Sequence, residues 1–423
     1  MFDNLYSNFF DISNRRRFLI ANALGFAGWK SDIVANADVL QKQGLSCILI
    51  FLKGGPSQLE TFDPKPGKPT GGPTKSIKTS VPGIQIAEGW PNTAKIMKHI
   101  SIVRSLTNTV AEHSRAVYHL HTGYIPKAGV KFPNIGSLVS NELASPTREL
   151  PSFVSIGTAN NTIGAGFLGM SHAPFVVNDA SKLPQNASMP RKIDTDRLSR
   201  RFSLLGDLEN HYALMGAKSR VDDHKSVYSS AARLIQSSNL KCFDISSENE
   251  KVRESYGKND VGNGCLLARK LVENGVTFVE VESGNWDTHH DHFDRIRPLN
   301  ATTDQAFAAL IEDLYQRKIL SKTLVIMMGE FGRSPIINLR NGRDHFPKAF
   351  SMILAGAGIK SGYVFGATNA DGTDIKDNKV SVEDIFCTFY QALKIQPSKE
   401  NIGPLERPIK IMDKGKSIKN LFG

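Results

Sequence analysis

Short runs of apolar, mostly β-branched residues recur along the chain, and between them apolar residues return at every third or fourth position. Continuous apolar runs are typical of strands covered on both faces, whereas three- and four-residue spacing is typical of amphipathic helices. The pattern predicts an α/β fold, a three-layer sandwich with a mostly parallel central sheet between helical layers. The predicted strands are residues 47–52, 100–103, 153–156, 276–281, 323–328 and 350–354.

Helices are predicted between these strands. Residues 263–274 and 303–318 carry the helical spacing, and Ser381 with Asp384 resembles a capping box that begins a last helix. The stretch of about 180–256 is polar, rich in Ser, Lys, Arg and Asp, and contains no convincing strand. We interpret it as a helical insertion in the sheet domain.

The amino terminus is typical of an export signal. Arg15 and Arg16 precede a short apolar run, and Ala35-Asn36-Ala37 supplies a small-x-small cleavage pattern. The run is shorter than the roughly 20 residues that cross a bilayer as a helix, so no transmembrane anchor is expected. We therefore expect the twin-arginine export machinery as a partner and a periplasmic or otherwise exported location; the alternative is an ordinary amphipathic first helix. The predicted division is a signal peptide at 1–37 and a mature domain at 38–423.

Composition excludes some classes of protein. With 423 residues, 40% of them hydrophobic, the chain has enough apolar material for a large core. The 52 Lys and Arg exceed the 41 Asp and Glu, giving a charge of +11 that suits anionic partners. No block of five like charges occurs, so no dedicated nucleic-acid binding is expected. Four cysteines without a C-x-x-C pair argue against a thiol metal site, although Cys242 and Cys265 could pair in an oxidising compartment.

Reactive side chains gather in the segments that follow two predicted strands. Asp287 and His289 follow the strand at 276–281, Glu330 follows that at 323–328, and His345 comes a little later. Loops at the carboxyl ends of parallel strands converge, and carboxylates with imidazoles are ligands for zinc or similar ions. We predict that these four side chains hold a divalent metal such as Zn, one ion rather than two. The competing explanation is a hydrogen-bonded network in which Asp287 and His289 maintain the loop shape.

The loop after the first strand carries two further carboxylates. Glu60 and Asp63 are candidate ligands for a second ion, and either could equally be a cap or turn carboxylate. The two glycines that follow the strand directly would let the backbone approach an anion, but they form no known phosphate-binding motif.

Five separated motifs stand out along the chain. They are Gly54-Gly55-Pro56-Ser57-Gln58 with Thr61-Phe62-Asp63-Pro64-Lys65-Pro66, His113-Ser114-Arg115 through Thr122-Gly123-Tyr124, Trp286-Asp287-Thr288-His289, Gly329-Glu330-Phe331-Gly332-Arg333 and Gly342-Arg343-Asp344-His345. Together they look like the bacterial domain of unknown function 1501 family, which is itself similar to the sulfatase and alkaline phosphatase superfamily and commonly carries a twin-arginine signal. The resemblance covers nearly all of the mature chain and implies an alkaline-phosphatase-like fold.

The resemblance also implies site roles. It makes Asp287, His289, Glu330 and His345 metal ligands, although Glu330-Phe331 stands where the superfamily has an Asp-His pair. It puts His113 at the nucleophile position with Ser114 beside it, while helix packing and capping would explain both equally well. Three arginines would neutralise the oxygens of an ester: Arg115, Arg333 and Arg343.

Two functions therefore remain open. The first is a metal-dependent hydrolase of a phosphate or sulfate ester, whose substrate is an anionic small molecule or polysaccharide ester. The second is a non-catalytic binding or cell-surface assembly protein that keeps the fold. The surviving carboxylates and imidazoles favour the first, and Phe331 favours the second. A nuclease is a poorer third interpretation, because aromatic residues do not interleave with the basic ones.

Overall fold

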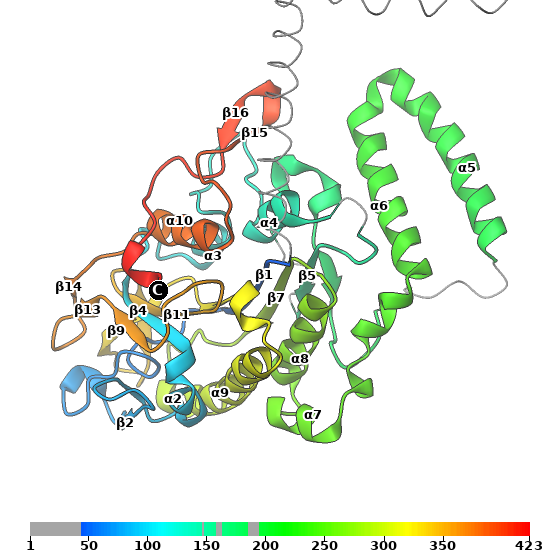
Figure 1. Ribbon diagram of the computed structural model, residues 1–423. Helices are drawn as coiled ribbons and strands as arrows, with labels where there is room; N and C mark the ends of the chain where they lie inside the picture. Colours follow the sequence, from blue (N-terminus) through cyan, green and yellow to red (C-terminus); the bar gives the residue numbers. More distant parts are fainter. Residues whose placement is uncertain (1–43, 146–147, 158–162, 185–193) are drawn as a thin grey trace, which may run out of the picture. The chain divides into compact units, whose positions relative to one another are not determined.

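A central sheet of eight strands organises the fold (Figure 1). The computed structural model describes residues 44–145, 148–157, 163–184 and 194–423. The strand order is β12-β4-β11-β8-β1-β7-β5-β6, and β11 is antiparallel to both of its neighbours while the other seven strands are parallel to one another. The strands are β1 (Ser46–Leu52), β4 (Ile100–Leu106), β5 (Phe153–Ile156), β6 (Phe175–Val177), β7 (Phe278–Ser283), β8 (Thr323–Met328), β11 (Phe350–Ala355) and β12 (Tyr363–Phe365).

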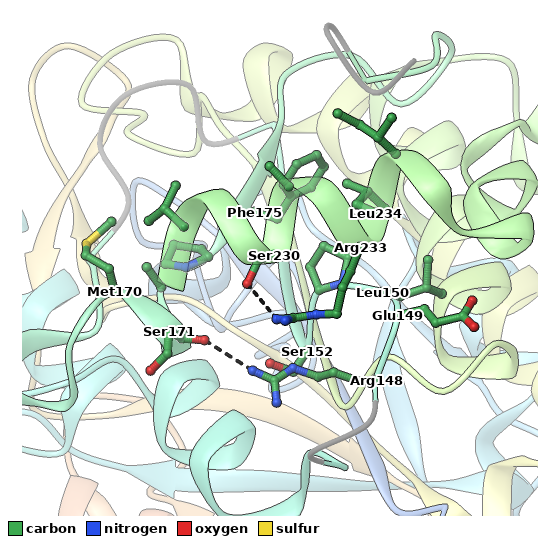
Figure 2. A pocket seen from close by; sticks show the side chains of 16 residues that line it. Arg148, Glu149, Leu150, Ser152, Met170, Ser171, Phe175, Ser230, Arg233 and Leu234 are labelled. Carbon is green, nitrogen blue, oxygen red and sulfur yellow. Dashed lines mark hydrogen bonds between the residues drawn. The ribbon is translucent and has the colours of Figure 1, made fainter. Parts of the chain in front are cut away.

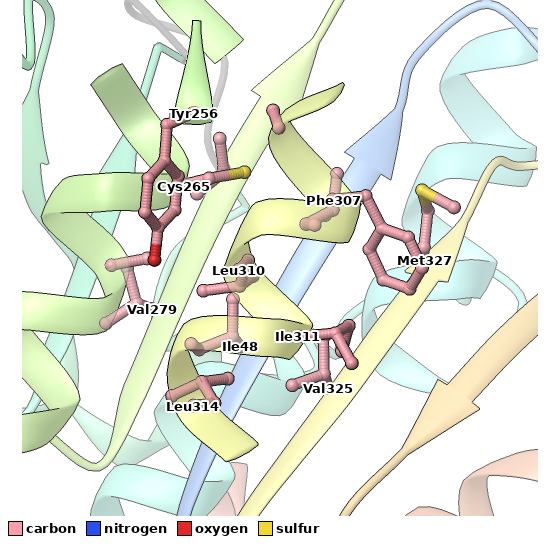
Figure 3. Packing of buried hydrophobic residues seen from close by; sticks show 14 of the residues in the cluster. Ile48, Tyr256, Cys265, Val279, Phe307, Leu310, Ile311, Leu314, Val325 and Met327 are labelled. Carbon is pink, nitrogen blue, oxygen red and sulfur yellow. The ribbon is translucent and has the colours of Figure 1, made fainter. Parts of the chain in front are cut away.

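Helices cover both faces of this sheet, which confirms the predicted α/β class with a mostly parallel sheet. Residues alternate along β1: Ile48 and Ile50 pack into one apolar cluster and Leu49 and Phe51 into the other. Figure 3 shows Ile48 beside Leu310 and neighbouring strand residues. On the Ile48 face lie α2 (Pro91–Lys95), α7 (Glu250–Tyr256), α8 (Asp260–Glu273) and α9 (His292–Gln316); on the other lie α3 (His113–Thr122), α4 (Ile135–Leu143) and α10 (Val382–Ala392).

Helix α9 begins eleven residues before the predicted start at 303. It runs from His292 to Gln316 with Pro298 inside it. The first half of the helix was not predicted because it contains a proline and is mostly polar, so it lacks the continuous apolar stripe that indicates a helix. At the other end of the chain the capping box is present: Ser381 accepts from the Asp384 N–H, and α10 follows.

The polar stretch after the sheet's edge strand forms a helical hairpin (Figure 1). Helices α5 (Thr195–Tyr212) and α6 (Lys218–Gln236) are joined by a π-helical turn, Ala213–Ala217, in which Gly216 has a φ of 93°. From residue 194 to 256 the structure contains helices and no strand.

Small antiparallel hairpins complete the described fold. They are β2 (Ser76–Lys78) with β3 (Gln85–Ala87), β9 (Gly332–Ile337) with β10 (Arg343–Phe346), β13 (Ala367–Thr368) with β14 (Ile375–Asp377), and β15 (Glu400–Ile402) with β16 (Pro408–Lys410).

All four cysteines are buried free thiols, so Cys242 and Cys265 are not paired. Burial raises the pKa of the Cys242 thiol to about 11 and that of Cys265 to about 12.

Among the described residues, no helix is both long and apolar enough to cross a membrane. The predicted signal peptide at 1–37 lies outside them.

Candidate metal centre

Four segments meet where the parallel strands end. His113 is the first residue of α3, which follows β4, and the N-cap residue Glu112 accepts from the N–H groups of Ser114 and Arg115, both at 2.9 Å. Asp287 follows β7, Glu330 follows β8, and His345 lies on β10. Residues distant in sequence are thereby brought to one edge of the sheet, as expected for a parallel α/β fold.

Three side chains offer ligand atoms that all lie within 4.8 Å of one another: His113, Asp287 and His345. The Nε2 atom of His113 is 3.4 Å from Asp287 Oδ2, and Nε2 of His345 is 3.5 Å from Asp287 Oδ1. His289 adjoins this group, because its Nε2 atom is 3.0 Å from Asp287 Oδ1 and 3.0 Å from His345 Nε2. Nitrogen and oxygen atoms in such an arrangement can hold one divalent ion.

Each imidazole is oriented through its other nitrogen. His113 Nδ1 is 2.7 Å from Glu330 Oε1, His289 Nδ1 is 2.9 Å from Asp344 Oδ1, and His345 Nδ1 is 2.7 Å from the Ala111 carbonyl. Because a carbonyl only accepts, the neutral ring of His345 carries its proton on Nδ1 and leaves a lone pair on Nε2. Oxygen acceptors that fix the ring in this way are typical of metal-binding histidines.

Glycine is required in the first loop because two loops touch there. Gly54 has a φ of +113°, and a Cβ at this position would lie 2.5 Å from the backbone nitrogen of Asp287. Its N–H donates to Glu330 Oε1 at 2.9 Å, and its carbonyl accepts from Arg333. This loop therefore supports the centre through its backbone.

Neighbouring charges set the pKa values in the centre. The hydrogen bond to Glu330 raises the pKa of His113. Burial lowers the pKa of His345, with smaller contributions from the charges of Arg333, His113 and His289. Partial burial acts to raise the pKa of Asp287, but its pairing with Arg333 prevails and lowers it. Asp287 therefore stays ionised, and His345 favours the neutral form that binds metals.

The sequence matches one family model over almost all of the described chain. That model, described as a protein of unknown function (DUF1501), matches residues 45–422. The chain belongs to this family. No curated protein matches it.

Solved structures similar to this DUF1501 protein include members of the alkaline phosphatase and sulfatase superfamily. A sulfatase from Pseudoalteromonas sp. is 14% identical, with 86% of this chain and 72% of that one covered and a TM-score of 0.39. The phosphonate monoester hydrolase of Agrobacterium radiobacter is 11% identical, with coverages of 89% and 77% and a TM-score of 0.37. A protein in the alkaline phosphatase superfamily from Vibrio parahaemolyticus is 10% identical, with coverages of 83% and 66% and a TM-score of 0.40.

The structure places Glu330 behind the cluster. Its side chain is fully buried and contacts His113 and Gly54, and it is not one of the three residues whose ligand atoms converge. His113, which the resemblance placed at the nucleophile position, is a member of this group in place of Glu330. Phe331 is also buried, and its ring centroid lies 4.9 Å from that of His113 and 4.5 Å from that of His345.

The carboxylates of the first loop are engaged elsewhere. Glu60 accepts from Arg343 Nη2 at 2.7 Å and lies 2.8 Å from His292 Nε2. Asp63 pairs with Lys65 at 3.0 Å and accepts from the Thr368 hydroxyl. Both are buried, and among the described residues neither belongs to the group whose ligand atoms converge.

The three arginines have different surroundings. Arg333 is completely buried and donates to the carbonyls of Gly54, Gly55 and Arg343 and to Asp287. Arg343 is also completely buried and ties Glu60 to the carbonyls of Ser334, Pro335 and Thr70. Arg115 is exposed next to Ser114, which is exposed as well. Of the three, only Arg115 presents its guanidinium to solvent.

A buried His-Glu pair between α3 and β7 was not predicted from the sequence. His121 Nε2 is 2.9 Å from Glu280 Oε1, and its Nδ1 atom is 2.7 Å from the Val117 carbonyl. Burial acts to lower the pKa of His121, but Glu280 prevails and raises it. The available signal was Glu280 itself, a carboxylate inside the predicted apolar strand at 276–281, which requires a buried partner.

Proposed function

We propose that this DUF1501 protein is an exported, metal-dependent hydrolase of phosphate or sulfate esters, with one divalent ion held by His113, Asp287 and His345. The observation that supports it is the convergence of their ligand atoms within 4.8 Å. The orientation of the imidazoles also supports the proposal. The Nε2 atoms of His113 and His345 both face the carboxylate of Asp287, and hydrogen bonding within a loop does not by itself require that arrangement. The class of ester follows from the resemblance in motifs and from the basic charge of the chain.

The residues fit a zinc-like ion. Two atoms that each bind an ion at about 2.0–2.2 Å lie no more than about 4.4 Å apart. The distances of 3.4 and 3.5 Å from Asp287 to the two imidazoles satisfy this limit. His289 is the fourth candidate ligand. When bound, a divalent ion would polarise an ester oxygen or acidify a water molecule.

The residues around the centre supply positioning and charge. Arg333 keeps Asp287 ionised and fixed, and Glu330 holds the proton on His113 Nδ1 so that Nε2 faces Asp287. Ser114 and Arg115 are exposed in the first turn of α3, next to His113. Arg115 is the side chain available to bind ester oxygens of an anionic small molecule or polysaccharide, and Ser114 is available as a hydroxyl nucleophile or donor.

One observation favours a second function, a binding or cell-surface assembly protein that keeps the fold. Arg333 pairs with Oδ1 of Asp287, which is the oxygen that faces His289 and His345. A guanidinium in this place could substitute for the positive charge of an ion.

Metal content and hydrolysis of the same samples test the proposal. We expect about one zinc or similar ion per chain in the purified protein, with hydrolysis of p-nitrophenyl phosphate or p-nitrophenyl sulfate. His345→Ala should lose most of the ion and at least about 100-fold of the rate, because second-sphere changes alone cost 10- to 100-fold. His290→Ala is the matched control, since His290 is exposed and pairs with Asp291 outside the cluster.

A wild-type protein that binds no ion on titration with zinc would remove the proposed centre. A protein that binds one ion but hydrolyses neither ester would support the second function.

A further inference from the structure

A pocket of about 330 Å³ lies beside helix α6 (Figure 2). Its walls are α6, the segment of residues 148–152 that precedes β5, and residues 170–175, which lead into β6. None of the residues discussed for the metal centre lines it. The pocket lies between helix α6 of the helical hairpin and the segments that lead into strands β5 and β6.

Most of the wall is apolar. Leu150 and Leu234 are buried at its base, Phe175 is half-buried, and Val227 is 42% exposed at its rim. A helix that presents Val227, Ala231 and Leu234 at three- and four-residue spacing offers a continuous apolar stripe. A volume of this size is typical of sites for small organic molecules.

Two arginines line the same pocket. Figure 2 shows the guanidinium groups of Arg148 and Arg233 near each other, with Ser171 and Ser230 beside them. In the described part of the chain both guanidiniums donate to neutral oxygens: Arg148 to the carbonyls of Ser145 and Ser171, both at 3.3 Å, and Arg233 to Ser230 Oγ at 3.1 Å. The pair therefore carries two positive charges that no described carboxylate neutralises.

The acidic groups nearby are already engaged. Glu149 lines the pocket, but its carboxylate accepts from Ser237 Oγ at 2.6 Å and from Asn239 Nδ2 at 3.2 Å, and Figure 2 shows it directed away from Arg148. Asp223, on the same helix, accepts from the backbone N–H of Met170 at 2.8 Å. The electrostatic effect is visible at two groups: burial and the charge of Arg233 lower the pKa of Arg148, and burial together with Arg148 lowers the pKa of His172.

We propose that this pocket binds an anionic amphiphile, a small organic molecule with an apolar tail and a carboxylate or sulfate head. The tail lies against Leu150, Phe175 and Leu234, and the head lies between Arg148 and Arg233. Guanidinium groups bind planar oxyanions through paired hydrogen bonds, and two of them beside an apolar wall match a molecule with both parts. This site is independent of the metal centre and of the hydrolase proposal.

Binding of decanoate, measured by calorimetry on the complete protein, tests the proposal. Decanoate supplies both parts of the ligand, decanol supplies the tail without the charge, and acetate supplies the head without the tail. We expect one decanoate per chain, with binding of decanol and acetate at least about tenfold weaker, since each lacks one of the two contributions. Addition of salt should weaken decanoate binding, because the head group is held by charge.

Variants place the bound molecule. Arg148→Gln and Arg233→Gln should each weaken decanoate binding at least about tenfold, and Val227→Glu should do the same by placing a negative charge at the rim. Arg220→Gln, an exposed arginine on the same helix outside the pocket, is the matched control and should bind as wild type does. Circular dichroism of each variant establishes that it folds.

Three results would overturn the proposal. One is a wild-type protein that does not bind decanoate, as expected if another segment of the chain or a second copy fills the pocket. Another is equal binding of decanol and decanoate, which would show that the arginines contribute nothing. The third is unchanged binding in folded Arg148→Gln and Val227→Glu variants, which would place the molecule on another apolar surface.

Discussion

Glu330 is completely buried, yet one of its two oxygens has no hydrogen-bond partner among the described residues. The other oxygen accepts from the Gly54 N–H and from His113 Nδ1. Burying a carboxylate with so few partners costs free energy. The hydrogen bond that Glu330 forms with His113 orients the imidazole, which is typical of groups that support metal-binding histidines. Glu330 is therefore a positioning residue for the candidate centre.

Glu330→Gln tests this role at the residue scale. The amide keeps the size of the side chain but removes the charge that fixes the His113 proton on Nδ1, so we expect zinc affinity to fall about 10- to 100-fold. Competition with a chromophoric chelator measures the affinity. Glu406→Gln is the control, because Glu406 is exposed and distant from the centre in sequence. Equal zinc affinity in Glu330→Gln and wild type would show that the carboxylate does not orient the ligand.

Residue types near the centre could be predicted from sequence, but the identity of each contact could not. Asp287, His289 and His345 were expected together and lie within 3.0–3.5 Å of one another at the atoms measured. The place of His113 beside Asp287 was not predicted, because only the path of the chain from β4 into α3 brings its ring there. The Ala111 carbonyl, which orients His345, is invisible in sequence because any residue supplies a carbonyl.

At the scale of elements, continuous apolar runs predicted the interior strands well. They did so because a strand covered by helices on both faces is apolar at most of its positions. The edge strands β6 and β12, three residues each, carry too few positions for such a pattern. The early start of α9 was not predicted for another reason. Its first residue, His292, is held by a polar contact with Glu60 at 2.8 Å and not by apolar packing, so it adds nothing to the apolar pattern.

This Glu60 network joins three elements: the loop after β1, the first turn of α9 and, through Arg343, strand β10. Burial acts to raise the pKa of Glu60, but His292 and Arg343 prevail and lower it. A carboxyl whose pKa is lowered by folding stabilises the folded state at pH values above its ordinary pKa, near 4.5. That stabilisation is lost as the pH falls through the lower pKa of the folded state.

Glu60→Gln should therefore lower the free energy of unfolding at pH 7 by about 3–5 kcal/mol, because it leaves Arg343 buried without its anion. The difference between variant and wild type should be smaller at pH 4 than at pH 7, because pH 4 lies below the ordinary pKa of Glu60, near 4.5, and the unfolded wild type then binds a proton more readily than the folded protein does. Urea unfolding at both pH values measures it, with the exposed Glu88→Gln as control. A difference that does not change with pH would show that the charge of Glu60 does not contribute.

At the scale of the whole molecule, the candidate centre exists only in the folded chain. His113, Asp287 and His345 come from segments after β4, after β7 and on β10, and they meet only once the sheet has formed. A protein that acquires its metal in the cytoplasm and works outside must then cross the membrane folded. The twin-arginine route transports folded proteins, so the signal predicted at residues 1–37 would require any metal to be bound before export.

Replacement of Arg15 and Arg16 by lysine tests this link between the export signal and folding. We expect the precursor to stay in the cytoplasm with its metal bound, because the double arginine and not its charge is recognised. Arg17→Lys is the matched control: it changes the neighbouring residue in the same way and should leave export intact. Fractionation with amino-terminal sequencing measures the outcome, and the exported form should begin at Asp38. If the double lysine variant still yields that form, the chain leaves by a route that does not read the arginines, and metal loading before export loses its support.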